Sequence, residues 1–180
     1  MRKLKNEELE RLSVEEFKSS PKTGLTLVLD EVRSLNNVGS FFRTADAFLI
    51  DKIVLCGITA QPPHKDIHKT ALGATETVDW EYEEKTATAI KKLQNAGVEV
   101  WAVEQAEGST SLQDLRLDPN KAYALVFGHE VKGVQQEVVS LCDGVVEIPQ
   151  YGTKHSFNVS VSAGIVLWEF FRQKRYSQNA

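Results

Sequence analysis

Cysteine is scarce in this chain. Only Cys56 and Cys142 occur among 180 residues, with no CxxC pair and no histidine at metal-ligand spacing. Disulfide-dependent domains are typical of secreted proteins, and structural zinc sites need several closely spaced ligands. We therefore expect two buried, reduced thiols, no metal site and a cytoplasmic location.

Long apolar runs are also missing. No stretch reaches the ~20 apolar residues that a helix needs to cross a bilayer. The first residues, MRKLKNEELERL, are rich in charge and lack the apolar core of a signal peptide. Both observations favour a cytoplasmic protein that does not bind membranes.

The chain has no surplus of basic residues. It carries 21 Lys and Arg against 25 Asp and Glu, a net charge of −4. Nucleic-acid binders more often show a positive excess, so the overall charge argues mildly against nucleic acid, although a local basic patch still binds phosphate. The hydrophobic share of 42% is close to the globular average, which favours one compact domain with a sizeable core.

Two common phosphate-binding motifs are absent. No GxGxxG follows the first predicted strand and no GxxxxGK[ST] occurs, which disfavours a dinucleotide-type Rossmann site and a P-loop. No serine lies in GxSxG, and the side chains of the neighbours His155 and Ser156 point apart, so a hydrolase triad is not indicated.

What the chain does contain is an alternation of apolar strands and helices. Strands are predicted over 25–29, 52–56, 78–82, 98–103, 122–127 and 144–148, and helices over about 36–48, 67–72, 85–95, 135–141 and 158–175. Strands that are apolar throughout and alternate with helices indicate an α/β fold with a mostly parallel sheet flanked by helices. Asn36 or Asn37 is expected to cap the first of these helices.

Residues 1–24 are expected to form an N-terminal helical tail and linker, and residues 25–180 the single domain. Leu4, Leu9, Leu12 and Phe17 recur at roughly helical spacing, which predicts a short amphipathic helix over 2–19. The segment from Ser19 to Gly24 is typical of a turn or linker.

Polar clusters follow three of the predicted strands. They are Asn37 to Arg43, Gly128 to Gly133 with Glu130, and Ser156 with Asn158. Ligands of open parallel sheets collect beyond the carboxyl ends of the strands. Each cluster alone has a structural explanation: helix caps for the Asn and Ser residues, and a surface position or a pair with Asp46 for Arg43. Their combination at three strand ends favours a ligand site.

The segments LNNVGSFFRTADAF, LVFGHEVKGV and IPQYGTKHSFNVSVSAGI resemble the three sequence motifs of the SpoU/TrmH family of RNA ribose 2′-O-methyltransferases, within the SPOUT superfamily. The resemblance runs from Leu25 to Phe171. It implies a C-terminal deep trefoil knot, a homodimer with its active site at the subunit interface, S-adenosylmethionine as methyl donor, and a transfer or ribosomal RNA as substrate.

The resemblance also implies residue roles. Arg43, Asn37, Glu130, Ser156 and Asn158 match its catalytic positions. Its cofactor-binding segments correspond to Val103, Glu104, Phe127, Gly128, Gly133, Ile148, Phe157 and Asn158, with Phe157 standing where Leu is more usual. Arg43 is expected to stabilise the developing alkoxide rather than act as the base, because its guanidinium pKa exceeds about 12.

His64, Lys65, Lys69 and Lys154 are the basic residues expected to bind RNA, and His68, Arg172, Lys174 and Arg175 are further candidates. Ordinary solvated surface explains any one of them equally well. An alternative function is a non-catalytic RNA- or cofactor-binding dimer with the same fold, which the intact Arg43, Ser156 and Asn158 disfavour. A third is an unrelated nucleotide-dependent α/β enzyme, which the missing phosphate loops disfavour.

Overall fold

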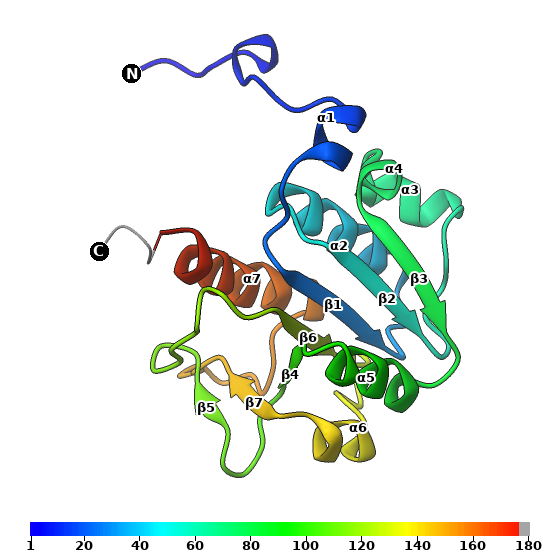
Figure 1. Cartoon of the computed structure of the whole chain (residues 1–180), viewed down its shortest axis with the longest axis vertical. Coiled ribbons are helices and arrows are strands. Elements are labelled where there is room, and N and C mark those ends of the chain that lie inside the picture. The colour runs from blue at the N-terminus through cyan, green and yellow to red at the C-terminus, as the bar shows by residue number, and fades with distance from the viewer. Residues whose placement is uncertain (177–180) are drawn as a thin grey trace.

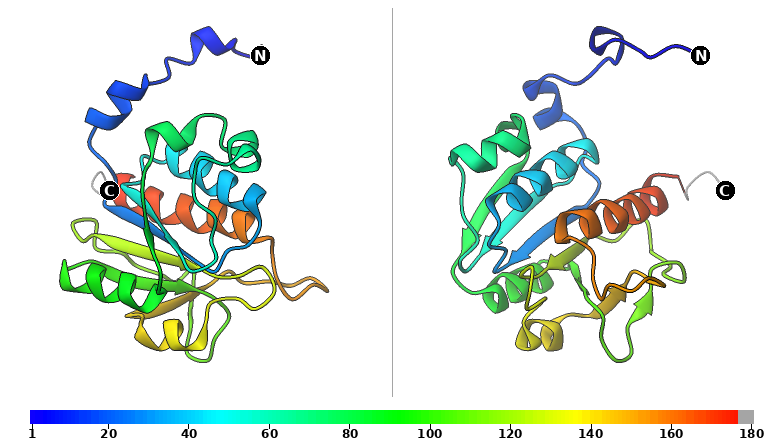
Figure 2. Two further views of the ribbon diagram at one scale, coloured as in Figure 1. Left: turned by 90° about the vertical axis from the view of Figure 1, so that its right-hand side faces the viewer. Right: turned by 180° about the vertical axis from the view of Figure 1, so that it is seen from behind.

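The computed structural model describes residues 1–176, which form a seven-stranded parallel sheet between two layers of helices (Figures 1 and 2). The strand order is β3-β2-β1-β6-β4-β7-β5, and every pair is parallel. The strands are β1 (Leu25–Asp30), β2 (Lys52–Cys56), β3 (Asp79–Glu83), β4 (Glu99–Val103), β5 (Thr110–Ser111), β6 (Tyr123–Phe127) and β7 (Gly144–Glu147). The predicted α/β class and parallel sheet are confirmed.

The helices cover both faces of this sheet. They are η1 (Asn6–Glu8), α1 (Val14–Ser19), α2 (Leu35–Ala47), α3 (Lys65–Ala71), α4 (Ala74–Thr77), α5 (Thr86–Asn95), α6 (Gln136–Leu141) and α7 (Val159–Tyr176). Leu27 and Leu29 of β1 pack in the same core cluster as α2 and α7, whereas Val28 packs with α5 and α6. Because β1 is covered on both faces, it is apolar along most of its length.

Three local predictions are wrong. The N-cap of α2 is Ser34, whose hydroxyl accepts a hydrogen bond from the Asn37 backbone, rather than Asn36 or Asn37. The tail forms the short η1 and α1 instead of one helix, because its apolar residues find little surface to cover: Phe17 is buried while Leu4 and Leu12 stay exposed. The two-residue β5 and the four-residue α4 lie where no strand or helix is predicted, since elements this short leave no hydrophobic pattern.

Helix α7 returns from β7 to the face of the sheet that α2 covers (Figure 2). The Phe48 and Phe171 rings meet there at 5.3 Å, and Phe170 packs edge-on against Tyr123 of β6. The buried Gln173 donates to the Leu115 carbonyl and accepts from the Leu117 backbone, each at 3.0 Å. The last helix is therefore fixed to the connection between β4 and β6.

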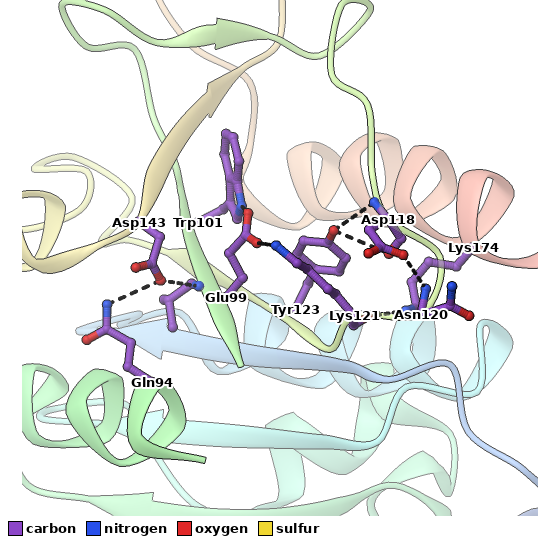
Figure 3. A network of polar contacts seen from close by, with 10 residues as sticks. Gln94, Glu99, Trp101, Asp118, Asn120, Lys121, Tyr123, Asp143 and Lys174 are labelled. Carbon is purple, nitrogen blue, oxygen red and sulfur yellow. Dashed lines mark hydrogen bonds and ion pairs between the residues drawn. The ribbon is translucent and has the colours of Figure 1, made fainter. Parts of the chain in front are cut away.

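A polar network ties α7 to the amino ends of β4 and β6 (Figure 3). The Lys174 ammonium donates to the carbonyls of Pro119, at 3.1 Å, and Lys121. Burial lowers its pKa, although Asp51 and Asp118 partly counter that effect. Lys174 therefore stabilises the fold, and its contact with RNA stays a prediction.

Both cysteines are free thiols, with Cys56 buried and Cys142 partly buried. Burial raises the pKa of each thiol to about 12, which leaves them protonated and poorly nucleophilic. Across residues 1–176, the structure has no helix that combines the length and apolar character needed to traverse a membrane.

Candidate active site

A cleft of about 800 Å³ opens at the carboxyl ends of β4, β6 and β7. Four stretches line most of it: 103–107, 127–134, 147–150 and 156–159. All the predicted cofactor-binding residues lie on its walls, namely Val103, Glu104, Phe127, Gly128, Gly133, Ile148, Phe157 and Asn158. Their predicted proximity is confirmed, and their role in binding a cofactor stays a prediction.

The wall formed by the loop after β6 is a tight turn. His129 and Gly133 exchange two backbone hydrogen bonds, of 3.1 and 2.8 Å, and the His129 ring nitrogen Nδ1 accepts from the Val131 backbone at 3.0 Å. A Cβ atom at Gly128 would collide with the backbone of Gly133 and Val134. Only glycine permits this close return of the chain at position 128.

Two successive residues at the end of β4 hold the loops on either side of the cleft. Glu104 accepts hydrogen bonds from the backbone of Val134 at 3.0 Å and of Gln105 at 2.9 Å. The Gln105 side-chain amide donates to the His155 carbonyl at 2.7 Å. The end of β4 therefore links the loop after β6 to the loop after β7.

Beside the cleft, three predicted catalytic residues form one hydrogen-bonded network. Asn37 donates its side-chain amide to Glu130 Oε1 at 2.9 Å and accepts from the Asn158 amide at 3.2 Å. The Glu130 carboxylate also accepts from the backbone of Ser34 at 2.8 Å and Arg33 at 3.1 Å. The network joins α2, the loop after β6 and the start of α7.

Asn158 has a second role at the start of α7. Its Oδ1 accepts from the Ser160 backbone at 2.9 Å and from the Ser160 hydroxyl at 2.7 Å. The expected cap of this helix by Asn158 is confirmed, and the same side chain also contacts Asn37. A single asparagine therefore fixes both the helix end and the network.

The hydrogen bonds that Glu130 accepts favour its negatively charged form. Burial raises the pKa of this carboxyl, but the bonds from Asn37 and from the Ser34 and Arg33 backbones outweigh burial and lower the pKa below its ordinary value of 4.5. Glu130 is therefore ionised at neutral pH, and its carboxylate is a weak base. Its geometry suits holding the network in place rather than accepting a proton.

The other two predicted catalytic residues lie outside this network. Ser156 is exposed and lines the cleft. Arg43 is exposed on α2, does not line the cleft, and forms no ion pair within residues 1–176. A single copy of the chain thus brings Asn37, Glu130 and Asn158 together but leaves Arg43 apart.

The predicted RNA-binding residues fall in two places. His64, Lys65 and Lys69 are exposed at α3, where His64 Nδ1 accepts from the Asp66 backbone at 3.2 Å and caps the helix. Lys154 is exposed on the loop after β7 and does not line the cleft. Of the further candidates, Arg172 pairs with Glu169 at 2.6 Å on the surface of α7.

Sequence reasoning missed Ser160, Gln105 and the backbone groups of Arg33 and Ser34. The spacing of Asn158 and Ser160 matches a local Asx-type turn and was a usable signal for Ser160. The backbone donors carry no sequence signal, because any residue type supplies an N–H.

The chain is similar to known RNA-modifying proteins. The SpoU rRNA Methylase family matches residues 24–168. The 23S rRNA (guanosine-2′-O-)-methyltransferase RlmB of Nitrosomonas europaea is 37% identical over 150 residues, covering 83% of this chain and 56% of that relative. Across the first three such relatives, this chain covers 56%, 60% and 59% of their length.

Solved structures with the same architecture include two that are more than 25% identical to this chain. A TrmH/SpoU tRNA modifying enzyme from A. aeolicus superposes with a TM-score of 0.81 at 26% identity, covering 92% of this chain and 82% of that one. An AdoMet-bound rRNA methyltransferase from Sinorhizobium meliloti gives 0.77 at 29% identity, covering 84% and 57%.

Proposed function

The chain belongs to the SpoU rRNA methylase family, and from that premise we propose that it transfers a methyl group from S-adenosylmethionine to a ribose 2′-hydroxyl of transfer or ribosomal RNA. The observation that carries the proposal is the placement of the network of Asn37, Glu130 and Asn158 at the mouth of the 800 Å³ cleft. The relatives of this chain named as 2′-O-methyltransferases, and the AdoMet-bound neighbour, support it.

The cleft fits the proposed cofactor. Its volume lies within the range that small-molecule sites occupy. Ile148 and Phe157 give it apolar surface, while the tight turn from Gly128 to Gly133 places backbone groups along its wall. When bound, the cofactor supplies an activated methyl group on sulfonium sulfur. Ile148 and Phe157 would contact the bound cofactor and help to orient it.

The chain's own residues would then hold the RNA hydroxyl. Ser156 is exposed on the cleft wall and is suited to orient the hydroxyl or a neighbouring phosphate. Glu130 is excluded as the base by its lowered pKa and its hydrogen bonds. Arg43 stays protonated and stabilises negative charge that develops on the 2′-oxygen. The proton passes to water or to a substrate phosphate.

Arg43 reaches a cleft when two copies of the chain associate. An exposed apolar stripe runs along α7, with Val161 51%, Ile165 36% and Trp168 48% exposed at spacings that share one helix face. Such a stripe marks an interaction surface. Trp168 also packs against Phe48 at the end of α2, the helix that carries Arg43. We infer a homodimer through α7 in which Arg43 serves the partner's cleft.

We also infer that the C-terminal part of the chain is knotted. The connection between β4 and β6 contacts the chain after β7 at two places. Gln105 donates to the His155 carbonyl on the loop after β7, and the backbone of Leu115 and Leu117 bonds to Gln173 of α7. A chain that passes through this connection before forming α7 accounts for both contacts. In the same proposal, residues 1–24 form the tail and 25–180 the methyltransferase domain.

One experiment separates this function from a non-catalytic binding dimer. The protein is incubated with methyl-labelled S-adenosylmethionine and either transfer or ribosomal RNA, and the label is mapped to a nucleotide. We expect label on a ribose 2′-oxygen, lost in Arg43→Ala. Label on a base, or equal label from Arg43→Ala, contradicts the proposal; binding of both ligands without transfer supports the non-catalytic alternative.

A further inference from the structure

A second hollow of about 490 Å³ lies beside α3, α4 and β3. It is lined by Pro62, Pro63, His64, Lys65, Ile67, His68, Thr75, Glu76 and Trp80, none of which lines the cleft. We propose that this hollow binds one unpaired base of an RNA strand, stacked against Trp80, with the neighbouring phosphates held by His64, Lys65 and His68. The proposal rests on the proposed function, since it adds a second contact to the same RNA.

The lining of the hollow suits a nucleobase. Trp80 is partly buried, packs on the core beside α2 and still borders the hollow, so its indole is an anchored aromatic surface. Pro62 and Pro63 extend that apolar surface. Thr75 and Glu76 add polar atoms that suit the edge of a base. Unpaired bases stack on such aromatic surfaces and form hydrogen bonds along their edges.

The charge around the hollow suits phosphate. His64, Lys65, His68 and Lys69 are all exposed on or next to α3, whereas Glu76 is the acidic residue of the lining. The acidic residues of β3 point elsewhere. Trp80 lies beside Ile53 of β2, whose side chain faces the layer that contains α2. Glu81 lies beside Val54, whose side chain faces the layer that contains α5, so Glu81 points away from the hollow. Glu81 accordingly forms an ion pair with Lys52 beside a separate hollow under α5.

The hollow is rigidly linked to the helix that carries the network. Thr70 of α3 donates its hydroxyl to the Asn36 carbonyl at 3.0 Å, next to Asn37. One turn further, a Cβ atom at Gly39 would collide with the Ile67 carbonyl, so only glycine lets α2 and α3 approach this closely. His64 Nδ1 is occupied by the Asp66 backbone, which leaves Nε2 for a phosphate. RNA held at the hollow is therefore fixed relative to α2.

Binding of short single-stranded oligoribonucleotides, measured by fluorescence anisotropy without cofactor, tests the hollow directly. We expect Trp80→Ala to weaken binding about tenfold, within the range of one lost base–aromatic stack. Trp80→Phe should keep most of the affinity. Tyr82→Ala, which removes an exposed aromatic residue of the same strand outside this hollow, is the matched control and should bind like the unaltered protein.

An oligonucleotide series with one abasic nucleotide at each position in turn identifies the base. One position should lower the affinity of the unaltered protein but not that of Trp80→Ala. Equal losses in both proteins at every position, equal losses in Trp80→Ala and Tyr82→Ala, or no measurable RNA binding by the unaltered protein overturn the proposal. Replacing the exposed Lys65 and Lys69 by Ala should reduce the salt dependence of binding. Because both residues lie on the surface, this variant tests the site even if Trp80→Ala fails to fold.

The two proposals fail independently. A protein that binds oligonucleotides through Trp80 but never transfers a methyl group loses the proposed function and keeps this site. A protein that methylates RNA, and whose Trp80 variants bind and methylate as the unaltered protein does, keeps the function and loses the site.

Discussion

The side-chain amide of Asn37 donates to Glu130 Oε1 at 2.9 Å across 93 residues of sequence. Through this bond the first turn of α2 is joined to the loop after β6, at the edge of the cleft. Glu130 is held on its other side by the backbone of Ser34 and Arg33. The carboxylate therefore holds the segment after β1 and the loop after β6 in fixed relative positions. We expect removal of its negative charge to lower the stability of the fold.

Glu130→Gln should destabilise the protein by about 1–3 kcal/mol, because an amide presents one acceptor oxygen to three donors and leaves one backbone N–H unpaired. Chemical denaturation measures the free energy of unfolding. Glu137→Gln, at an exposed position of α6, is the control and should be neutral. Identical stability of Glu130→Gln and the control contradicts the role of Glu130 as a link.

The same carboxyl makes stability depend on pH. The folded-state pKa of Glu130 lies below its ordinary value of 4.5. Its contribution is then fully present above the unfolded pKa and is lost as the pH falls through the folded pKa. Between these two pH values the stability of the unaltered protein should fall more steeply than that of Glu130→Gln. Parallel pH profiles of the two proteins argue against this linkage.

Glu104 should affect cofactor binding indirectly, because its carboxylate holds the loop after β6 through the Val134 backbone. Glu104→Ala removes the acceptor for the Val134 backbone and frees the wall that contains Gly128 and Gly133. We expect weaker binding of S-adenosylmethionine by calorimetry, about tenfold for the loss of a hydrogen bond to a charged group. Glu107→Ala is matched, since Glu107 also lines the cleft but stays exposed. Equal affinities of the two variants remove Glu104 from the site.

Mixing two inactive variants tests whether Arg43 works on the partner subunit. Arg43→Ala and Ser156→Ala should each be inactive alone. In an equal mixture after subunit exchange, half the dimers are mixed, and each contains one cleft with both residues intact, so about a quarter of the activity should return. If mass analysis shows that the dimers have exchanged subunits and no activity returns, Arg43 acts in the cleft of its own subunit.

The apolar stripe of α7 gives a separate test of assembly. Trp168→Glu places a charge in the proposed interface and should shift the sedimentation mass from dimer to monomer, because an unpaired charge is costly to bury. Glu169→Gln, on the same helix but outside the stripe, should stay dimeric. A monomeric unaltered protein contradicts the interface at once.

Much of the fold was readable from local patterns. Strands such as 52–56 and 122–127 are short apolar runs bounded by polar or glycine residues, and the structure has β2 at Lys52–Cys56 and β6 at Tyr123–Phe127. Patterns failed where a segment has no surface to cover, as in the tail, or is too short to show a period, as in β5. The cap of α2 was misplaced because Ser34 and Asn37 are both good capping residues, and only the competing bond to Glu130 decides between them.

The sequence by itself determined the parallel α/β class, because strand periodicity is a local property of the chain. The order of three motifs, through their resemblance to a known family, also indicated several of the residues that line the cleft. The tertiary structure alone decided how those residues are used. It locks Glu130 as a link rather than a base, it makes Glu104 and Gln105 a bridge between two loops, and it leaves Arg43 outside the cleft of its own subunit. These outcomes depend on distances between segments far apart in sequence, and packing of the whole domain sets those distances.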